Sequence, residues 1–261
     1  MLLFIPLLPL LGFLVNASFG RRITRRAAGA VASGVMLASL LVSLVAVGKL
    51  VGLPPPARAI VEQAFSWISS GDFNVNLTLR LDPLSAVMIL VVTGIGSLIH
   101  IYSTAYMDGE TDSEYARYFS YLNLFAAFML LLVLGSNFLV MFVGWEGVGL
   151  CSYLLVGFWY QKKTASDAGK KAFIVNRVGD FGFLLGVLLA FVRFGTLDFQ
   201  DIARSVSAVG PETSSGPCRS SPCCSLSARL GNRRRFLFTS GCPTRWRGRR
   251  RSPRSFTRRR W

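Results

Sequence analysis

The feature that most constrains this chain is a series of long runs without formal charge. Spanning the ~30 Å hydrocarbon core of a bilayer takes roughly 20 helical residues. Residues 2–19 and 27–48 carry no charged side chain, and residues 118–161 carry one, Glu146. Apolar residues make up 52% of the 261 positions. These runs predict a multi-pass membrane protein and exclude a soluble domain.

The expected fold class is all-α, a polytopic transmembrane helix bundle with a short extramembrane β segment. The run 118–161 is too long for one helix and is expected to break at residues 135–137. "FNVNLTLRLD" alternates as a strand does, and "TLDFQDIARSVS" predicts a short amphipathic surface helix. The six expected transmembrane helices are residues 2–20, 27–50, 83–107, 115–135, 138–160 and 168–194.

Basic residues predict the orientation. Four arginines in "RRITRR" follow the first helix, and Lys162 and Lys163 follow the fifth. The positive-inside rule then places the N-terminus outside. Because the arginines come after the first apolar run, we interpret that run as a retained helix and not as a signal peptide. The acidic loop "MDGETD" falls inside, a weak objection because Asp and Glu contribute little to the rule.

The chain changes character near residue 211. Residues 1–210 carry a net charge of +3, whereas residues 211–261 hold 14 Arg, no Lys and one Glu. We therefore divide the chain into a membrane region, 1–210, and an Arg-rich tail, 211–261, that reads as disordered. An RNA- or lipid-binding arm is one interpretation of the tail. A zinc site is another, although the spacing fits no paired arrangement of the four tail cysteines Cys218, Cys223, Cys224 and Cys242.

Glu146 is the leading candidate for a functional residue. A carboxylate at bilayer depth costs several kcal/mol unless it is paired, protonated or hydrated. The glycines around it, at 144, 147 and 149, let helices approach and leave room for water. A protonated, hydrogen-bonded structural residue is the alternative, but intramembrane carboxylates more often mark ion or proton paths.

The sixth expected helix carries further ionisable groups. Arg177 and Asp180 lie three residues apart, so they share a face and are expected to pair, while Lys171 lies about two turns earlier. Together with Glu146, these residues predict a proton relay between two helices, against the alternative of a membrane ion pair and a snorkelling lysine. His100, the only histidine, is a further relay candidate, although a lone histidine is more often a hydrogen-bonded core residue.

Several motifs together resemble one family. "LDPLSAVM", "SLIHIYSTAYM", "FVGWEGVGLCSYLLVGFWY" and "KKAFIVNRVGDFGFLLG" are similar to the antiporter-like membrane subunits of respiratory complex I, the subunit L or chain 5 type. The resemblance runs to about residue 215 and implies proton translocation through Glu146, with Lys171, Arg177 and Asp180 at the family's charged positions on the sixth helix. It also implies a chain more than twice as long.

The resemblance implies a subunit without a redox site of its own. The sequence has no phosphate-binding loop and no metal-ligand cluster, so NADH, FMN, iron–sulfur clusters and quinone are expected on other subunits. The expected partners are the other membrane subunits of the complex, the lipid bilayer and protons, with no nucleic acid. A bacterial inner (plasma) membrane is expected in preference to the mitochondrial inner membrane.

The tail is interpreted as the family's seventh-helix region translated in the wrong frame. With synonymous codons for residues 231–238, reading from the last base of the Gly231 codon gives Lys-Ser-Ala-Gln-Ile-Pro-Leu, as in the family. The same shift works at each of the 31 junctions from Leu230/Gly231 to Arg260/Trp261. GC-rich codons read out of frame yield many arginines, so the Arg content requires no ligand.

Two other functions remain open. The chain could be part of the related large subunit of a multisubunit cation/proton antiporter or a membrane-bound hydrogenase, which neighbouring genes would reveal. Alternatively, it is a small membrane protein with a genuine RNA- or lipid-binding tail, which resequencing around codon 216 would test.

Overall fold

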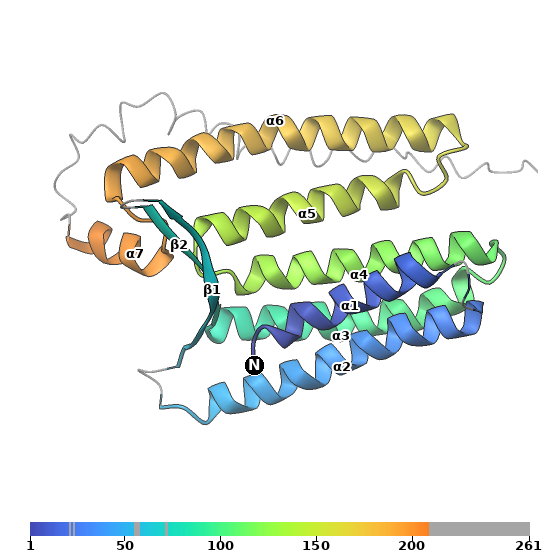
Figure 1. Ribbon diagram of the computed structural model, residues 1–261, viewed down its shortest axis with the longest axis horizontal. Coiled ribbons are helices and arrows are strands. Elements are labelled where there is room, and N and C mark those ends of the chain that lie inside the picture. Colours follow the sequence, from blue (N-terminus) through green and yellow to red (C-terminus); the bar gives the residue numbers. More distant parts are fainter. Residues whose placement is uncertain (21, 23, 55–57, 71–72, 209–261) are drawn as a thin grey trace, which may run out of the picture. The chain divides into compact units, whose positions relative to one another are not determined.

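The computed structural model describes residues 1–20, 22, 24–54, 58–70 and 73–208. All of them belong to one compact unit, Met1–Ser214. The predictions for the tail, including its four cysteines, lie outside the described residues. Figure 1 shows the helices α1 (Phe4–Phe19), α2 (Arg25–Val51), α3 (Pro83–Tyr106), α4 (Asp112–Leu134), α5 (Phe138–Val156), α6 (Lys163–Phe194) and α7 (Phe199–Ala208), with strands β1 (Ile60–Ser70) and β2 (Phe73–Leu81).

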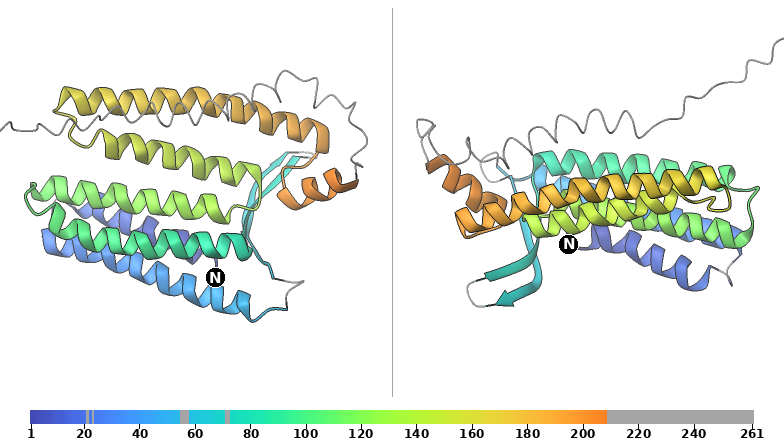
Figure 2. Two further views of the ribbon diagram at one scale, coloured as in Figure 1. Left: turned by 180° about the vertical axis from the view of Figure 1, so that it is seen from behind. Right: turned by 90° about the horizontal axis from the view of Figure 1, so that it is seen from above.

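The long helices lie side by side along a common direction (Figures 1 and 2). Helices α1 to α4 form a bundle in which α1 packs on α2 and α4, and α2 packs on α3. Helix α5 packs against α4, and α6 packs against α5. This order confirms the predicted transmembrane helix bundle. Among the described residues, five helices, α2 to α6, are long and apolar enough to cross a membrane, and the apolar helix α1 is shorter, with 16 residues.

Local sequence signals explain where the helices begin and end. Asp82 accepts a hydrogen bond from the Ser85 amide ahead of α3, and Thr111 forms a capping box with Glu114 at α4. The predicted break in the run 118–161 is confirmed: Gly135 ends α4 and Asn137 caps α5. Gly195 ends α6 with a left-handed φ of 68°.

Two helix bounds differ from expectation by four residues or more. Helix α6 begins at Lys163, five residues before the predicted start, and reaches 32 residues. Residues 163–167 contain no proline or glycine, so the helix extends beyond its apolar part into the polar region. Helix α5 ends at Val156, ahead of the predicted residue 160, because Gly157 follows it as the C-cap.

The extramembrane β segment is a two-stranded antiparallel hairpin, of which only the second strand was predicted. Register shifts between Gln63 and Phe65 and between Ser66 and Ile68 interrupt the alternation of β1, which hides that strand from a period-of-two search. The N-terminus packs on this strand: Glu62 accepts hydrogen bonds from the Met1 amino group and the Leu2 amide, both 2.6 Å long. The Met1 ammonium group lowers the pKa of Glu62.

The turn at residues 135–137 joins the hairpin to the chain beyond α6. The Ser136 amide donates to Thr78 on β2, and the Asn137 side chain donates to the carbonyl of Asn76 at 2.8 Å. From the other side, the Phe138 amide donates to the Leu197 carbonyl at 3.1 Å. Helix α7 follows, in the region predicted to be a short amphipathic helix. Hairpin and α7 therefore lie at one end of the bundle (Figure 1).

At the opposite end, Arg25 holds the acidic loop between α3 and α4. Its guanidinium donates to the carbonyl of Glu110 at 2.6 Å and forms ion pairs with Asp112 at 2.8 Å and Asp108 at 3.4 Å. An arginine from "RRITRR" thus pairs with two of the acidic side chains of the segment that weakened the orientation argument. Basic and acidic residues can therefore share the side of the membrane that the positive-inside rule assigns to them.

The bundle is apolar outside and partly polar inside. Large side chains such as Leu41, Leu84, Leu98 and Val192 are exposed, as expected of helices that face lipid. The interior of α1 to α4 buries the polar side chains Asn16, Ser39, Ser43, Thr93, Ser97, His100, Ser103, Ser120 and Asn123. Several of the hydroxyls donate to backbone carbonyls, as Ser39 does to Ile5 at 2.8 Å, which satisfies them within the bundle.

Candidate functional site

Helix α5 is held close to α4 by two of the three glycines that flank Glu146. A Cβ at Gly144 would lie 2.7 Å from the Leu132 backbone, and one at Gly147 would overlap the ring of Phe128. These two contacts show that α4 and α5 touch at Gly144 and Gly147, the positions that have no side chain. Gly149 differs, because a Cβ there would meet no described residue within 4 Å. The predicted close approach is confirmed at Gly144 and Gly147.

Glu146 forms an ion pair with Arg177 across the α5–α6 interface. The Arg177 guanidinium donates through Nη1 to Oε2 of Glu146. The Glu146 side chain is 20% exposed and that of Arg177 is 47% exposed. The ring of Phe173, one turn earlier on α6, lies 4.8 Å from the centre of the guanidinium. The carboxylate is thus compensated by a permanently charged partner.

Asp180 has a different partner from the one that its spacing predicted. It is buried, with 5% of its surface exposed, and accepts a hydrogen bond of 2.8 Å from the Trp145 indole Nε1. The predicted pairing of Arg177 with Asp180 is therefore wrong. Both residues do share the α6 face that meets α5, but two consecutive α5 residues, Trp145 and Glu146, supply a partner for each of them.

Three of the four predicted relay residues meet at this interface, and the fourth does not. Lys171 is exposed on α6 six residues before Arg177. Within the described part of the chain, no hydrogen bond or ion pair joins it to Glu146, Arg177 or Asp180. A lysine two turns away along a helix is about 9 Å farther along the axis, which explains its separation.

His100 lies in another part of the molecule, inside the α1–α4 bundle. Its Nδ1 lies 2.7 Å from the Gly96 carbonyl and its Nε2 lies 2.9 Å from Oδ1 of Asn123 on α4. Both ring nitrogens therefore have partners within the bundle. Asn123 is fully buried, and sequence reasoning missed it because an isolated asparagine in an apolar helix carries no positional signal.

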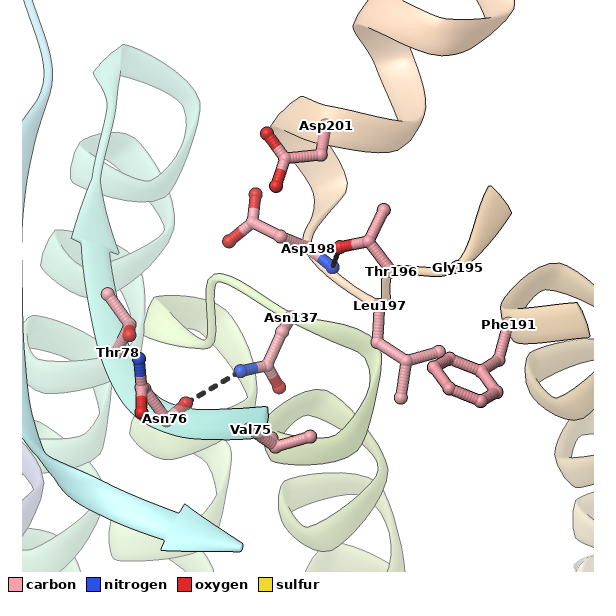
Figure 3. A pocket seen from close by; sticks show the side chains of 10 residues that line it. All are labelled: Val75, Asn76, Thr78, Asn137, Phe191, Gly195, Thr196, Leu197, Asp198 and Asp201. Carbon is pink, nitrogen blue, oxygen red and sulfur yellow. Dashed lines mark hydrogen bonds between the residues drawn. The ribbon is translucent and has the colours of Figure 1, made fainter. Parts of the chain in front are cut away.

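A cavity of about 250 Å³ lies at the hairpin end of the bundle (Figure 3). Its wall combines polar residues of β2 and the 135–137 turn with Asp198 and Asp201 near α7. The carboxylates already have partners: Asp198 accepts from the Gln200 amide at 2.8 Å, and Asp201 pairs with Arg204 at 2.9 Å. Among the described residues, no group of three or more His, Cys, Asp or Glu side chains is placed to hold a metal ion.

Two family models match the chain. Residues 67–119 match the N-terminus of chain 5 of NADH-ubiquinone oxidoreductase (complex I). Residues 135–216 match the transmembrane model shared by NADH:quinone oxidoreductase and the Mrp antiporter. The second match contains Glu146, Arg177 and Asp180 and ends at residue 216, close to the change in composition at residue 211.

Relatives with known names agree with these matches. NADH-quinone oxidoreductase subunit L of Mycobacterium tuberculosis is 42% identical over 233 residues, 86% of this chain and 36% of the relative. Subunit L of Pseudomonas aeruginosa is 46% identical over 196 residues, 75% of this chain and 32% of the relative. NADH-ubiquinone oxidoreductase chain 5 of Metridium senile is 44% identical over 199 residues, 76% and 32% of the two chains. The chain thus spans about a third of the length of the relatives that it matches.

Two solved structures share the fold. The Mrp complex of Dietzia sp. has a chain that is 28% identical, with a TM-score of 0.61 over 76% of this chain and 20% of that one. A chain of an archaeal membrane-bound sulfane sulfur reductase superimposes with a TM-score of 0.60 at 20% identity, over 76% of this chain and 29% of that one. The matched helices, the motifs around Glu146 and the relatives agree: the chain belongs to the family of antiporter-like membrane subunits of NADH-quinone oxidoreductase, of the subunit L or chain 5 type.

Proposed function

We propose that this chain is the N-terminal part of a proton-translocating membrane subunit of NADH-quinone oxidoreductase. The observation that carries the proposal is the ion pair between Glu146 and Arg177 on two helices that are apolar enough to cross a membrane. Such a pair costs free energy to desolvate. Ionisable residues inside a membrane mark ion or proton paths, so the pair supports proton movement at this interface. Glu146 is the protonatable carrier, and Arg177 and Asp180 set the electrostatics around it.

The remaining predicted components belong to the rest of the complex. NADH, FMN, iron–sulfur clusters and quinone are bound by other subunits, and this chain contributes to coupling in a bacterial plasma membrane. Lys171, at the basic end of α6, is a further electrostatic partner of the carrier. His100 is assigned a structural role, because both of its ring nitrogens are already hydrogen-bonded. The tail 211–261 is the out-of-frame product of a region that in full-length relatives continues the membrane domain.

Replacement of Glu146 tests this function in a full-length chain with the frame restored. Glu146→Gln keeps the size and hydrogen bonding of the side chain but removes its titration. We expect proton uptake by inverted membrane vesicles to fall sharply while the complex still assembles. Glu110→Gln, in the loop between α3 and α4, is the matched control and should pump at the parent level. Parent-level pumping by Glu146→Gln would make Glu146 a structural residue.

A second function, in a multisubunit cation/proton antiporter, is favoured by the Mrp chain of similar fold. The same vesicles separate the two functions. Proton uptake driven by NADH oxidation supports the complex I assignment, whereas exchange driven only by an imposed sodium gradient supports the antiporter.

A further inference from the structure

Two consecutive residues of α5 hold two residues of α6 that lie one turn apart. Glu146 pairs with Arg177, and Trp145 donates its indole N–H to Asp180 at 2.8 Å. Asp180 is the more buried of the two carboxylates, with 5% of its surface exposed. The ion pair is accounted for by the proposed function, whereas the indole contact is not.

The indole is held in a defined orientation by aromatic rings. The ring of Phe183, one turn after Asp180, is stacked near the indole with centroids 6.5 Å apart and planes inclined by 16°. Phe183 is in turn stacked on Phe142, with centroids 5.9 Å apart and planes inclined by 11°. Since Phe142 precedes Trp145 by about one turn of α5, rings from both helices fix the plane in which Nε1 points at Asp180.

The chemistry of an indole limits what Trp145 can do. Its Nε1 donates a hydrogen bond but accepts none and does not titrate, so Trp145 is no proton carrier. A donor to an ionised carboxylate makes a stronger hydrogen bond than one to a neutral group. The indole therefore retains Asp180 against α5 without supplying a charge. Arg177, three residues earlier on the same face, then has Glu146 as its charged partner.

We propose that Trp145 is a positioning residue: its indole N–H holds Asp180 in place and thereby keeps Arg177 on Glu146. This inference rests on the proposed function, because the residue acts on the carrier through two neighbours. Without the N–H, Asp180 loses its cross-helix partner and becomes the nearer alternative for Arg177, so that Glu146 loses its partner. Trp145 thus affects the number of protons pumped per electron and not the amount of folded protein.

The test compares Trp145→Phe, which keeps an aromatic ring beside Phe183, with Trp159→Phe. The indole of Trp159 also donates to a carboxylate, Glu110 at 3.2 Å, but lies in the exposed loop after α5. In lipid nanodiscs containing residues 1–261, the infrared carboxylate band that disappears in Asp180→Ala identifies Asp180. We expect this band to shift in Trp145→Phe and to stay in place in Trp159→Phe. An unmoved band in Trp145→Phe overturns the contact.

Pumping by the frame-restored chain in its complex provides the second readout. Protons pumped per electron, measured on assembled complexes, should fall in Trp145→Phe, because Asp180 then competes for Arg177. The double variant Trp145→Phe/Asp180→Ala should pump at the level of Asp180→Ala alone, because the competing carboxylate is absent and the indole has nothing to hold. A parent-level ratio in Trp145→Phe, or a double variant that pumps less than Asp180→Ala, overturns the proposal. If Trp145→Phe does not assemble, Phe183→Leu removes the stacked ring and must lower the ratio in the same direction.

The two levels of inference fail in different ways. If Glu146→Gln pumps at the parent level, the proposed function fails, and a stationary Asp180 band would then overturn the positioning role as well. If Glu146→Gln abolishes pumping but Trp145→Phe does not change it, the proposed function stands and the positioning role of Trp145 is overturned.

Discussion

Arg177 binds a carboxylate on the neighbouring helix in preference to the one on its own helix. A residue three positions away on a helix is only one of several groups within reach of a long side chain. In this molecule Asp180 is already engaged by Trp145, so the guanidinium turns to Glu146. The charged and polar partners at this site are therefore chosen across the α5–α6 interface and not along α6.

The pair of Glu146 and Arg177 should show strong coupling. Arg177→Gln alone leaves Glu146 without a counter-charge, whereas Arg177→Gln combined with Glu146→Gln leaves two neutral amides. We expect the single change to cost about 1–2 kcal/mol more than the double change, below the ~3–5 kcal/mol of fully buried pairs because Arg177 is half-exposed. Denaturant unfolding of residues 1–261 in detergent measures this difference. Additive losses would show that the two groups do not interact.

At the scale of elements, contact between α4 and α5 depends on positions without side chains. The ring of Phe128 occupies the space in which a Cβ at Gly147 would lie. The interface therefore has no room for a methyl group at this depth. Two residues later, at Gly149, a Cβ would have no neighbour within 4 Å in the described part of the chain. The requirement for glycine in α5 thus changes within one helical turn, between Gly147 and Gly149.

Gly147→Ala and Gly149→Ala form a matched pair that tests this packing. Overpacking at Gly147 should cost ~1–3 kcal/mol, since the Phe128 ring must move. Gly149→Ala should cost nothing and gain up to ~1 kcal/mol from helix propensity. The midpoint of thermal unfolding in detergent compares them. Equal midpoints would mean that α4 and α5 separate easily at Gly147.

The elements differ in how well the sequence predicts them. Uncharged apolar runs locate α2 to α5 to within a few residues, because lipid imposes their length and composition. Strand β1 is missed since two register shifts remove its alternation, and α6 starts early since polar helix beyond the bilayer has no apolar signature. Within the site, spacing indicates which face Arg177 and Asp180 share. It contains no information about which residues of α5 lie opposite that face.

At the scale of the whole molecule, the two ends of the bundle differ in their basic loops. The loops after α1 and α5 are rich in basic residues, and both lie at the end opposite the hairpin (Figure 2). At the same end, Arg25 pairs with Asp108 and Asp112. The described helices are thus compatible with one side facing the cytoplasm and the hairpin facing the other side.

Reporter fusions test this orientation. A fusion after Arg26 and another after Lys163 should both report a cytoplasmic location, because positive loops are retained on that side. A fusion at Arg58, before the hairpin, should report the periplasm and serves as the opposite control. A periplasmic signal at either of the first two positions would invert the topology.

The turn at residues 135–137 also constrains the order of folding. Residues 136–138 form hydrogen bonds with Asn76 and Thr78 before them and with Leu197 after them, so the set is complete only after the ribosome has made all three segments. Synthesis at roughly 5–20 residues per second implies a delay of roughly 6–24 s between the first segment and the last. Until residues 135–137 have been made, the edge of β2 lacks its partner. Because that edge lies beyond the membrane-spanning helices, water can satisfy its polar groups until the turn arrives.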